Sequence, residues 1–74
     1  MSEFDENFLD AVREELARAR HKFPEQSRLT TALALVEEVG ELAQAILQGA
    51  PESRVEAEAV QVAVMALRVV NDTV

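Results

Sequence analysis

Two prolines divide this chain into three segments of about 20 residues, and each segment spaces its apolar residues three or four positions apart. Pro24 and Pro51 both disfavour helical conformation in the residue before them. The spacing within each segment matches the 3.6-residue period of an α-helix. The valines of the third segment also suit a strand, but its length without turn signals favours a helix. The sequence therefore predicts an all-α fold, with helices over about 3–22, 28–48 and from Pro51 or Ser53 to near the end.

Several residues mark the expected helix ends. Ser2, with Asp5 three positions later, suits the N-terminus of the first helix. Gly49 suits the position just after the second helix, where a left-handed backbone is common. Ser53 and Glu56 form a capping-box pattern at the start of the third helix. Because the turn between the second and third helices is short, these two should pack as an antiparallel pair.

The size of the chain predicts one domain that is completed by assembly. A chain of 74 residues buries only about 60% of its unfolded surface and is marginally stable alone. Yet 49% of its residues are hydrophobic, and it has no cysteine that could form a disulfide. Apolar residues cover about half of the circumference of the second helix and nearly all of the circumference of the third. We expect a small antiparallel bundle of three main helices, completed by formation of a homodimer or homotetramer.

The charge of the chain excludes some classes of partner. The formal net charge is -7, which argues against nucleic-acid binding through a basic surface. The acidic N-terminus lacks the features of a signal peptide. No apolar run approaches the roughly 20 residues of a membrane span. We therefore expect no nucleic acid and no membrane as partners, and a cytoplasmic protein.

Acidic residues recur at one spacing on the second and third helices. Glu38 and Glu41 are three positions apart and share a helical face, and Glu58 and Gln61 repeat the spacing. In an antiparallel hairpin, these four side chains can offer oxygen atoms to one volume. Oxygen ligands without Cys or His favour Mg²⁺, with Mn²⁺ as an alternative. A solvated acidic helix face explains the same spacing without a metal.

The acidic pattern also resembles a known signature. The segment from Leu35 to Ala45 contains Glu37-Glu38-Val39-Gly40-Glu41, which looks like the Glu-Glu-x-x-Glu motif of the MazG-like nucleotide pyrophosphohydrolases. These belong to the all-α NTP pyrophosphatase superfamily. The Glu58 to Gln61 segment stands where that family carries Glu-x-x-Asp. The similarity covers about Phe4 to Val70 and includes a first helix that ends in Lys-Phe-Pro.

The resemblance implies a helical dimer or dimer of dimers that uses Mg²⁺ to cleave a (deoxy)nucleoside triphosphate into the monophosphate and pyrophosphate. It implies that Glu38, Glu41 and Glu58 are metal ligands. Glu37 lies beside them as support or as a base that orients water, so Glu37 and Glu38 are the candidate catalytic residues. Gln61 departs from the family pattern. Its amide can offer one oxygen to the metal but no charge, which should weaken metal binding.

Charged residues outside the four candidate ligands also have expected roles. Arg54 lies one turn before Glu58, where it can bind a phosphate or form an ion pair with Glu58. Arg68 and Asp72 continue the same stripe and are expected to form a surface ion pair. His21, near the end of the first helix, is expected to be a solvated residue that favours the helix C-terminus.

Two other functions fit the same sequence. One is a non-catalytic helical oligomer in which the acids are solvated or pair with a partner chain. The other is a relative that binds a nucleotide or metal without turnover, which the neutral Gln61 favours. No motif indicates which base or sugar is preferred.

Overall fold

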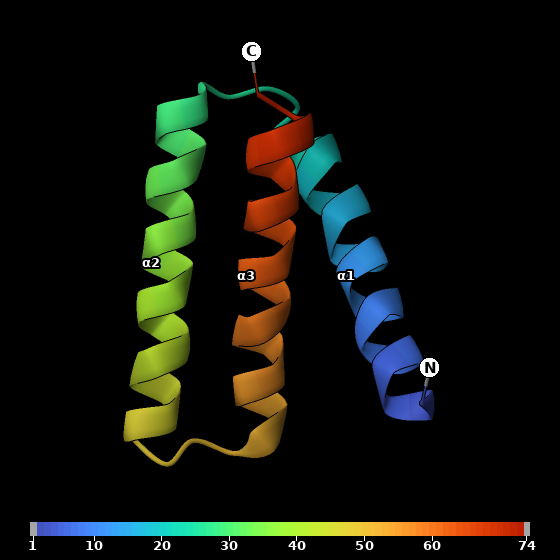
Figure 1. Ribbon diagram of the computed structural model, residues 1–74, viewed down its shortest axis with the longest axis vertical. Coiled ribbons are helices and arrows are strands. Elements are labelled where there is room, and N and C mark those ends of the chain that lie inside the picture. The colour runs from blue at the N-terminus through green and yellow to red at the C-terminus, as the bar shows by residue number, and fades with distance from the viewer. Residues whose placement is uncertain (1, 74) are drawn as a thin grey trace.

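The computed structural model describes residues 2–73 and contains three α-helices of 20 residues each (Figure 1). The helices are α1 (Glu3–Lys22), α2 (Arg28–Leu47) and α3 (Glu52–Asn71). Residues 2–73 contain no strand, and one isolated bridge joins Gln26 to Thr73. The all-α prediction is confirmed. No helix within this range is long and apolar enough to cross a membrane.

The first two predicted helix ends are confirmed. Ser2 and Asp5 form a reciprocal capping box at the start of α1, and this satisfies backbone N–H groups that have no partner inside the helix. Gly49, after α2, has a φ of 67°, which a residue without a Cβ adopts at low cost. The amide of Ala50 donates to the carbonyl of Ala45, so the turn closes over the last helical carbonyls.

The predicted cap of the third helix is wrong. The helix starts at Glu52, with Pro51 as its N-cap, and no side chain caps it. Ser53 therefore lies inside the first turn and does not precede it. Pro51 has a φ of -58°, which is already close to the helical value, so the helix can begin directly after it.

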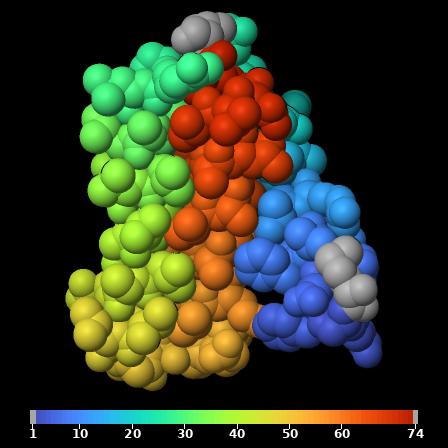
Figure 2. All heavy atoms as spheres, in the orientation of Figure 1, coloured from blue at the N-terminus to red at the C-terminus, as the bar shows by residue number. Residues whose placement is uncertain are grey.

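Helix α3 lies between the other two (Figure 1). It contacts α2 along an antiparallel hairpin, as predicted, and it contacts α1, which runs in the same direction as α3. Within the described chain, α1 and α2 make no comparable contact with each other. The space-filling view shows the side chains of α3 between those of α2 and α1 (Figure 2). The predicted three-helix bundle is confirmed, with one antiparallel and one parallel helix pair.

The buried core lies mainly where α1 meets α3. Its buried members are the valines Val12, Val60 and Val64. Partly buried side chains of α1 pack against these valines: Phe8, Ala11, Leu16 and Ala19. On α2, Thr31 and Ala45 are buried. Small side chains in these positions let α2 and α3 approach closely.

One face of α2 carries large apolar side chains that the single chain leaves uncovered. We call it the α2 outer face, and its members are Leu29, Leu33, Val36, Val39, Ile46 and Leu47. Each is about half exposed or more, and Leu47 reaches 84%. At 100° per residue most of these positions lie opposite the buried Thr31 and Ala45, and Val39 and Ile46 lie at the side of the helix, roughly 90° from them.

Arg68 forms a buried network at the C-terminal end of α1. Its side chain is only 3% exposed, and the guanidinium donates to the carbonyl oxygens of Ala19 and Phe23. It also pairs with Asp72 at 2.9 Å, and Asp72 pairs with Arg20 at 2.9 Å. We call Arg20, Arg68 and Asp72 the arginine corner. The predicted pair of Arg68 with Asp72 is confirmed. The prediction that this pair lies on the surface is wrong, because the free carbonyl groups at the end of α1 need a donor there and Arg68 supplies it.

Candidate metal and nucleotide site

Three carboxylates converge across the α2–α3 hairpin. Glu38 and Glu41 come from adjacent turns of α2, and Glu58 comes from the facing turn of α3. Each offers an oxygen atom within 4.8 Å of the other two. Glu41 is exposed, and the other two are half-buried. We call these three residues the acid cluster. The structure brings together three of the four predicted metal ligands.

Negative charge accumulates in this cluster, and no cationic side chain of residues 2–73 forms an ion pair with it. Burial raises the pKa of Glu38, and the charge and hydrogen bond of Glu41 add to the rise, followed by the charges of Glu58 and Glu37. The ion pairs within residues 2–73 all lie elsewhere, at Asp10, Glu15 and Asp72. A bound cation would favour the ionised carboxylates and reverse this effect.

The chemistry of the cluster fits a hard divalent cation. Three carboxylate oxygens from two rigid helices can hold Mg²⁺ or Mn²⁺, which both favour oxygen ligands. The chain has no cysteine, and the group that converges here contains no histidine. Magnesium held by carboxylates usually keeps coordination positions for water and for phosphate oxygens. The arrangement can therefore bring a phosphate group to a fixed place between α2 and α3.

Gln61, the fourth predicted ligand, points part of its amide toward α1. Burial raises the pKa of Glu15, but hydrogen bonds from Arg18 and Gln61 outweigh it and lower the pKa below its usual value. The Gln61 amide nitrogen is the only group of this side chain that can donate to a carboxylate. Its carbonyl oxygen is still available to a cation. The role of Gln61 as a metal ligand stays a prediction.

Glu37 lies beside the acid cluster and not within it. Its side chain is exposed on α2, 100° around the helix from Glu38. Of the charges that raise the pKa of Glu38, that of Glu37 contributes least. The structure thus places Glu37 next to the cluster, and its catalytic role stays a prediction.

Arg54 is exposed on the first turns of α3, before Glu58. No ion pair between Arg54 and Glu58 forms in the described part of the chain. Of the two interpretations of Arg54, the ion pair is therefore not observed. The phosphate contact remains a prediction.

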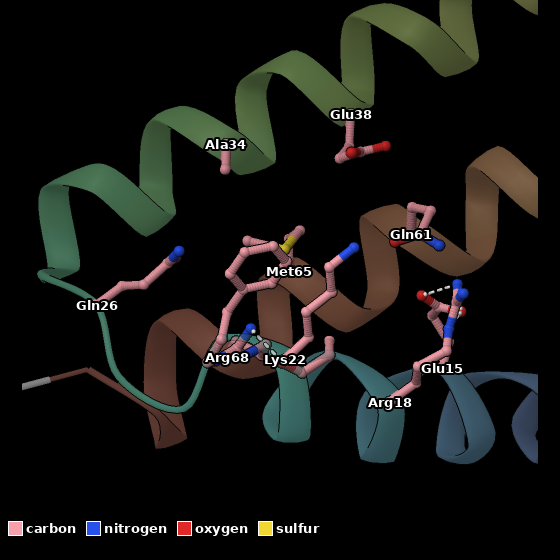
Figure 3. A pocket seen from close by; sticks show the side chains of 11 residues that line it. Glu15, Arg18, Lys22, Gln26, Ala34, Glu38, Gln61, Met65 and Arg68 are labelled. Carbon is pink, nitrogen blue, oxygen red and sulfur yellow. Dashed lines mark hydrogen bonds and ion pairs between the residues drawn. The ribbon is translucent and has the colours of Figure 1, made fainter.

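A pocket of about 320 Å³ adjoins the acid cluster and is lined by all three helices (Figure 3). We call it the interhelical pocket. Glu38 forms one edge, where the pocket meets the cluster, and Gln61 and Met65 line it from α3. The side of α1 contributes Arg18 and Lys22.

The contribution of α1 to this pocket was not foreseen from the sequence. The spacing of Glu15, Arg18, Ala19 and Lys22 puts them on one helical face, which is the available signal. What the spacing does not reveal is that α1 lies along α3 in a parallel direction. That packing is what turns this face toward Glu38.

Searches of protein-family models, curated proteins and solved structures found no match to this chain. The features that bear on function are therefore the acid cluster, the pocket beside it and the resemblance of the Glu37–Glu41 motif.

Proposed function

We propose that this protein is a Mg²⁺-dependent nucleoside triphosphate pyrophosphohydrolase, which converts a (deoxy)nucleoside triphosphate into the monophosphate and pyrophosphate. The observation that carries the proposal is the approach of three carboxylates within 4.8 Å, without a cationic side chain paired to any of them in residues 2–73. The resemblance of the same residues to the MazG-like motif supports it. Mn²⁺ is the alternative metal.

The residues of the acid cluster take distinct roles in this proposal. Glu38, Glu41 and Glu58 would hold the metal, with the Gln61 carbonyl as a neutral addition. The bound metal supplies charge neutralisation to the phosphate oxygens. Glu37, exposed beside the cluster, would orient the attacking water.

The reaction itself is a hydrolysis at the α-phosphorus. The water oxygen forms a bond to this phosphorus, and the bond from it to the α–β bridging oxygen breaks. The bridging oxygen leaves with pyrophosphate, and a carboxylate accepts a proton from the water. Arg54, one turn before Glu58, would contact the phosphates that leave.

A turnover assay tests the proposal. The wild-type protein is incubated with Mg²⁺ and each of the common NTPs and dNTPs, and pyrophosphate and orthophosphate are measured separately. We expect pyrophosphate from wild type and from Glu14→Ala, an exposed acid of α1, but none from the double variant Glu38→Ala, Glu41→Ala. Metal or nucleotide binding without product would favour a binding protein that lacks turnover. No metal binding at all would favour the non-catalytic helical oligomer.

We further propose that the protein functions as a homodimer joined through the α2 outer face, with a homotetramer as the larger alternative. Two copies of α2 packed antiparallel about a two-fold axis at residue 38 would pair large side chains with small ones. Leu33 would face Ala43 of the partner subunit, and Val36 would face Gly40 of the partner subunit. A Cβ added at Gly40 would meet no atom within 4 Å, so the surface there is open to a close approach. Helices with such contacts pack about 8–10 Å apart.

Sedimentation equilibrium tests the assembly. We expect wild-type dimers or tetramers at micromolar concentration, and monomers for Val36→Glu, because a carboxylate would be buried without a partner. The matched control is Val70→Glu, since Val70 is 73% exposed on α3 and lies outside the α2 outer face. A monomeric wild type, or equal effects of the two substitutions, would contradict the proposed interface.

A further inference from the structure

The interhelical pocket contains a positive charge close to the acid cluster. Lys22, the last residue of α1, lines the pocket together with Glu38 and Gln61. Figure 3 shows its ammonium group extending from α1 into the space below α2, on the side of Gln61. Lys22 takes part in no ion pair within the described range. A cation in this position can bind an anionic group that also reaches the acid cluster.

An aromatic ring lies next to this charge. Phe23 lines the same pocket and is 49% exposed, and the Lys22 ammonium is 5.5 Å from the centre of its ring. Ala34 and Met65 add apolar surface to the pocket wall. An accessible ring in the pocket wall can stack on a planar heterocycle, and every nucleobase has such a face.

The arginine corner fixes the backbone that carries this ring. Arg68 is buried and donates to the carbonyl oxygens of Phe23 and Ala19. Asp72 holds the same guanidinium from the other side. The position of Phe23 is thus set by contacts that a ligand does not need to form, which lowers the ordering cost of binding.

The order of side chains along α3 gives the pocket a direction. Arg54, Glu58, Gln61 and Met65 follow one another along the same stripe, over about 16 Å at 1.5 Å per residue. The interhelical pocket adjoins the Gln61–Met65 end, and Arg54 lies at the opposite end, beyond Glu58. A ligand that spans this stripe would place different parts at the ring, at the acids and at Arg54.

We propose that the interhelical pocket binds the nucleoside monophosphate half of the substrate, with the base against the ring of Phe23 and the α-phosphate at the ammonium of Lys22. The two outer phosphates then extend past the acid cluster toward Arg54. This inference rests on the proposed function, because it assigns the substrate's orientation in the same site. It makes Lys22 and Phe23 binding residues for the part of the substrate that becomes the monophosphate product.

Calorimetric titration with Mg²⁺ present tests the inference, with dAMP, dCMP, dGMP, dTMP and inorganic pyrophosphate as separate probes. We expect Phe23→Leu and Lys22→Met each to weaken the best-bound monophosphate about tenfold, which is the scale of one lost stacking or charge contact. Both variants should bind pyrophosphate as wild type does. The matched controls are Phe4→Leu, which changes an exposed ring on α1, and Arg13→Met, which changes another exposed cation of α1. Both controls should bind the monophosphates as wild type does.

Three results would overturn the inference. One is that both variants bind the monophosphates within twofold of wild type. Another is that they lose pyrophosphate and monophosphate equally. The third is that wild type binds none of the four monophosphates. If wild type still releases pyrophosphate from a triphosphate in any of these cases, the proposed function survives and only the substrate's orientation is wrong.

The methyl resonance of Met65 gives a second readout that does not depend on variants. It lies in the pocket wall, so it should shift in NMR spectra when a monophosphate is added, and pyrophosphate alone should leave it unmoved. An unmoved Met65 methyl with a bound monophosphate would contradict the inference.

Discussion

Two sites that contain carboxylates lie along α3 and have opposite surroundings. Asp72, at the end of α3, accepts a hydrogen bond from Arg20, which holds its pKa below the usual range against the effect of burial, and Arg68 adds to the lowering. Glu38 faces α3 farther down, where burial and the neighbouring carboxylates raise its pKa. In the arginine corner, two guanidinium groups of the same chain thus compensate the negative charge of Asp72. The acid cluster is left with an excess of negative charge.

This contrast separates a site that stabilises the fold from a site that we propose to bind a metal. The arginine corner satisfies the end of α1 and joins it to α3, so its charges have structural partners. The acid cluster holds like charges together at a cost in folding free energy, and perturbed acids of this kind are more common at functional sites. The two sites should therefore respond differently to substitution, to Mg²⁺ and to pH.

The largest expected effect is on the arginine corner. Replacing Arg68 with Met should lower the free energy of unfolding by about 3 kcal/mol, because it breaks a buried ion pair and removes the donor to two carbonyl groups. In a chain of this size that loss lowers the melting temperature by more than about 10 °C. Thermal and urea unfolding followed by circular dichroism measure it.

Arg20 provides the comparison within the same corner. It contacts the same carboxylate but is 44% exposed, and Arg68 would still hold Asp72 without it. Arg20→Met should therefore cost only a small part of the loss seen for Arg68→Met. Equal losses for the two variants would show that burial does not distinguish the two arginines.

The second effect is on the acid cluster and has the opposite sign. Glu38→Gln should stabilise the metal-free protein by about 0.5 kcal/mol, because it removes a like charge from two neighbours. Mg²⁺ at a hundred times its Kd should stabilise wild type by about 2.7 kcal/mol and should do much less for the variant. Melting curves with and without Mg²⁺ measure both changes.

A charge-matched control separates the cluster from the net charge of the chain. Glu14→Gln removes the same charge from an exposed position on α1, outside the cluster. It should keep the full response to Mg²⁺. If the stabilisation by Mg²⁺ falls equally in both variants, it results from general screening of the negative charges and not from binding at the acid cluster.

The smallest effect is the dependence of stability on pH. Because the folded pKa of Glu38 lies above its usual value of 4.5, its ionisation costs more in the folded chain than in the unfolded chain. The metal-free protein should lose stability as the pH rises from about 4.5 through the raised pKa. Asp72 acts in the opposite sense, since its stabilisation is complete above its usual pKa of 3.8 and is lost as the pH falls through the lowered value.

Melting temperatures between pH 3 and 8 can separate these two contributions. Glu38→Gln should flatten the decline above about pH 4.5, and Mg²⁺ should reverse it in wild type. Asp72→Asn should flatten the loss on the acid side. A wild-type profile that rises steadily from pH 4.5 to 7 without metal would contradict the assignment for Glu38.

Local sequence signals were enough to predict the helices and much of the acid cluster. The apolar period and the caps at Ser2 and Gly49 act within one turn, so they can be read from the chain directly. The three-residue spacing of Glu38 and Glu41, with a short turn before Glu58, also led to the observed group. The capping pattern at Ser53 and the proline at Pro51 both marked a possible start of α3. The prediction from Ser53 was wrong, because the helix begins directly after Pro51.

Features that depend on tertiary packing could not be predicted in the same way. The burial of Arg68 results from the end of α1 lying against α3, and the interhelical pocket results from the same parallel packing. The pattern of α1 alone does not specify which side of the hairpin it contacts. An uncovered apolar surface on α2 was expected, because its apolar positions extend too far around the helix for one neighbour to cover them.

Metal binding by the acid cluster is the central claim, and an NMR titration tests it most directly. Wild type and the double variant Glu38→Gln, Glu41→Gln are titrated with Mg²⁺, and trace Mn²⁺ is then added to broaden nearby resonances. We predict saturable shifts in wild type, with Mn²⁺ broadening centred on Glu38, Glu41 and Glu58, and neither effect in the variant. Unchanged wild-type spectra at millimolar Mg²⁺, or broadening spread evenly over the acidic surface, would contradict the claim.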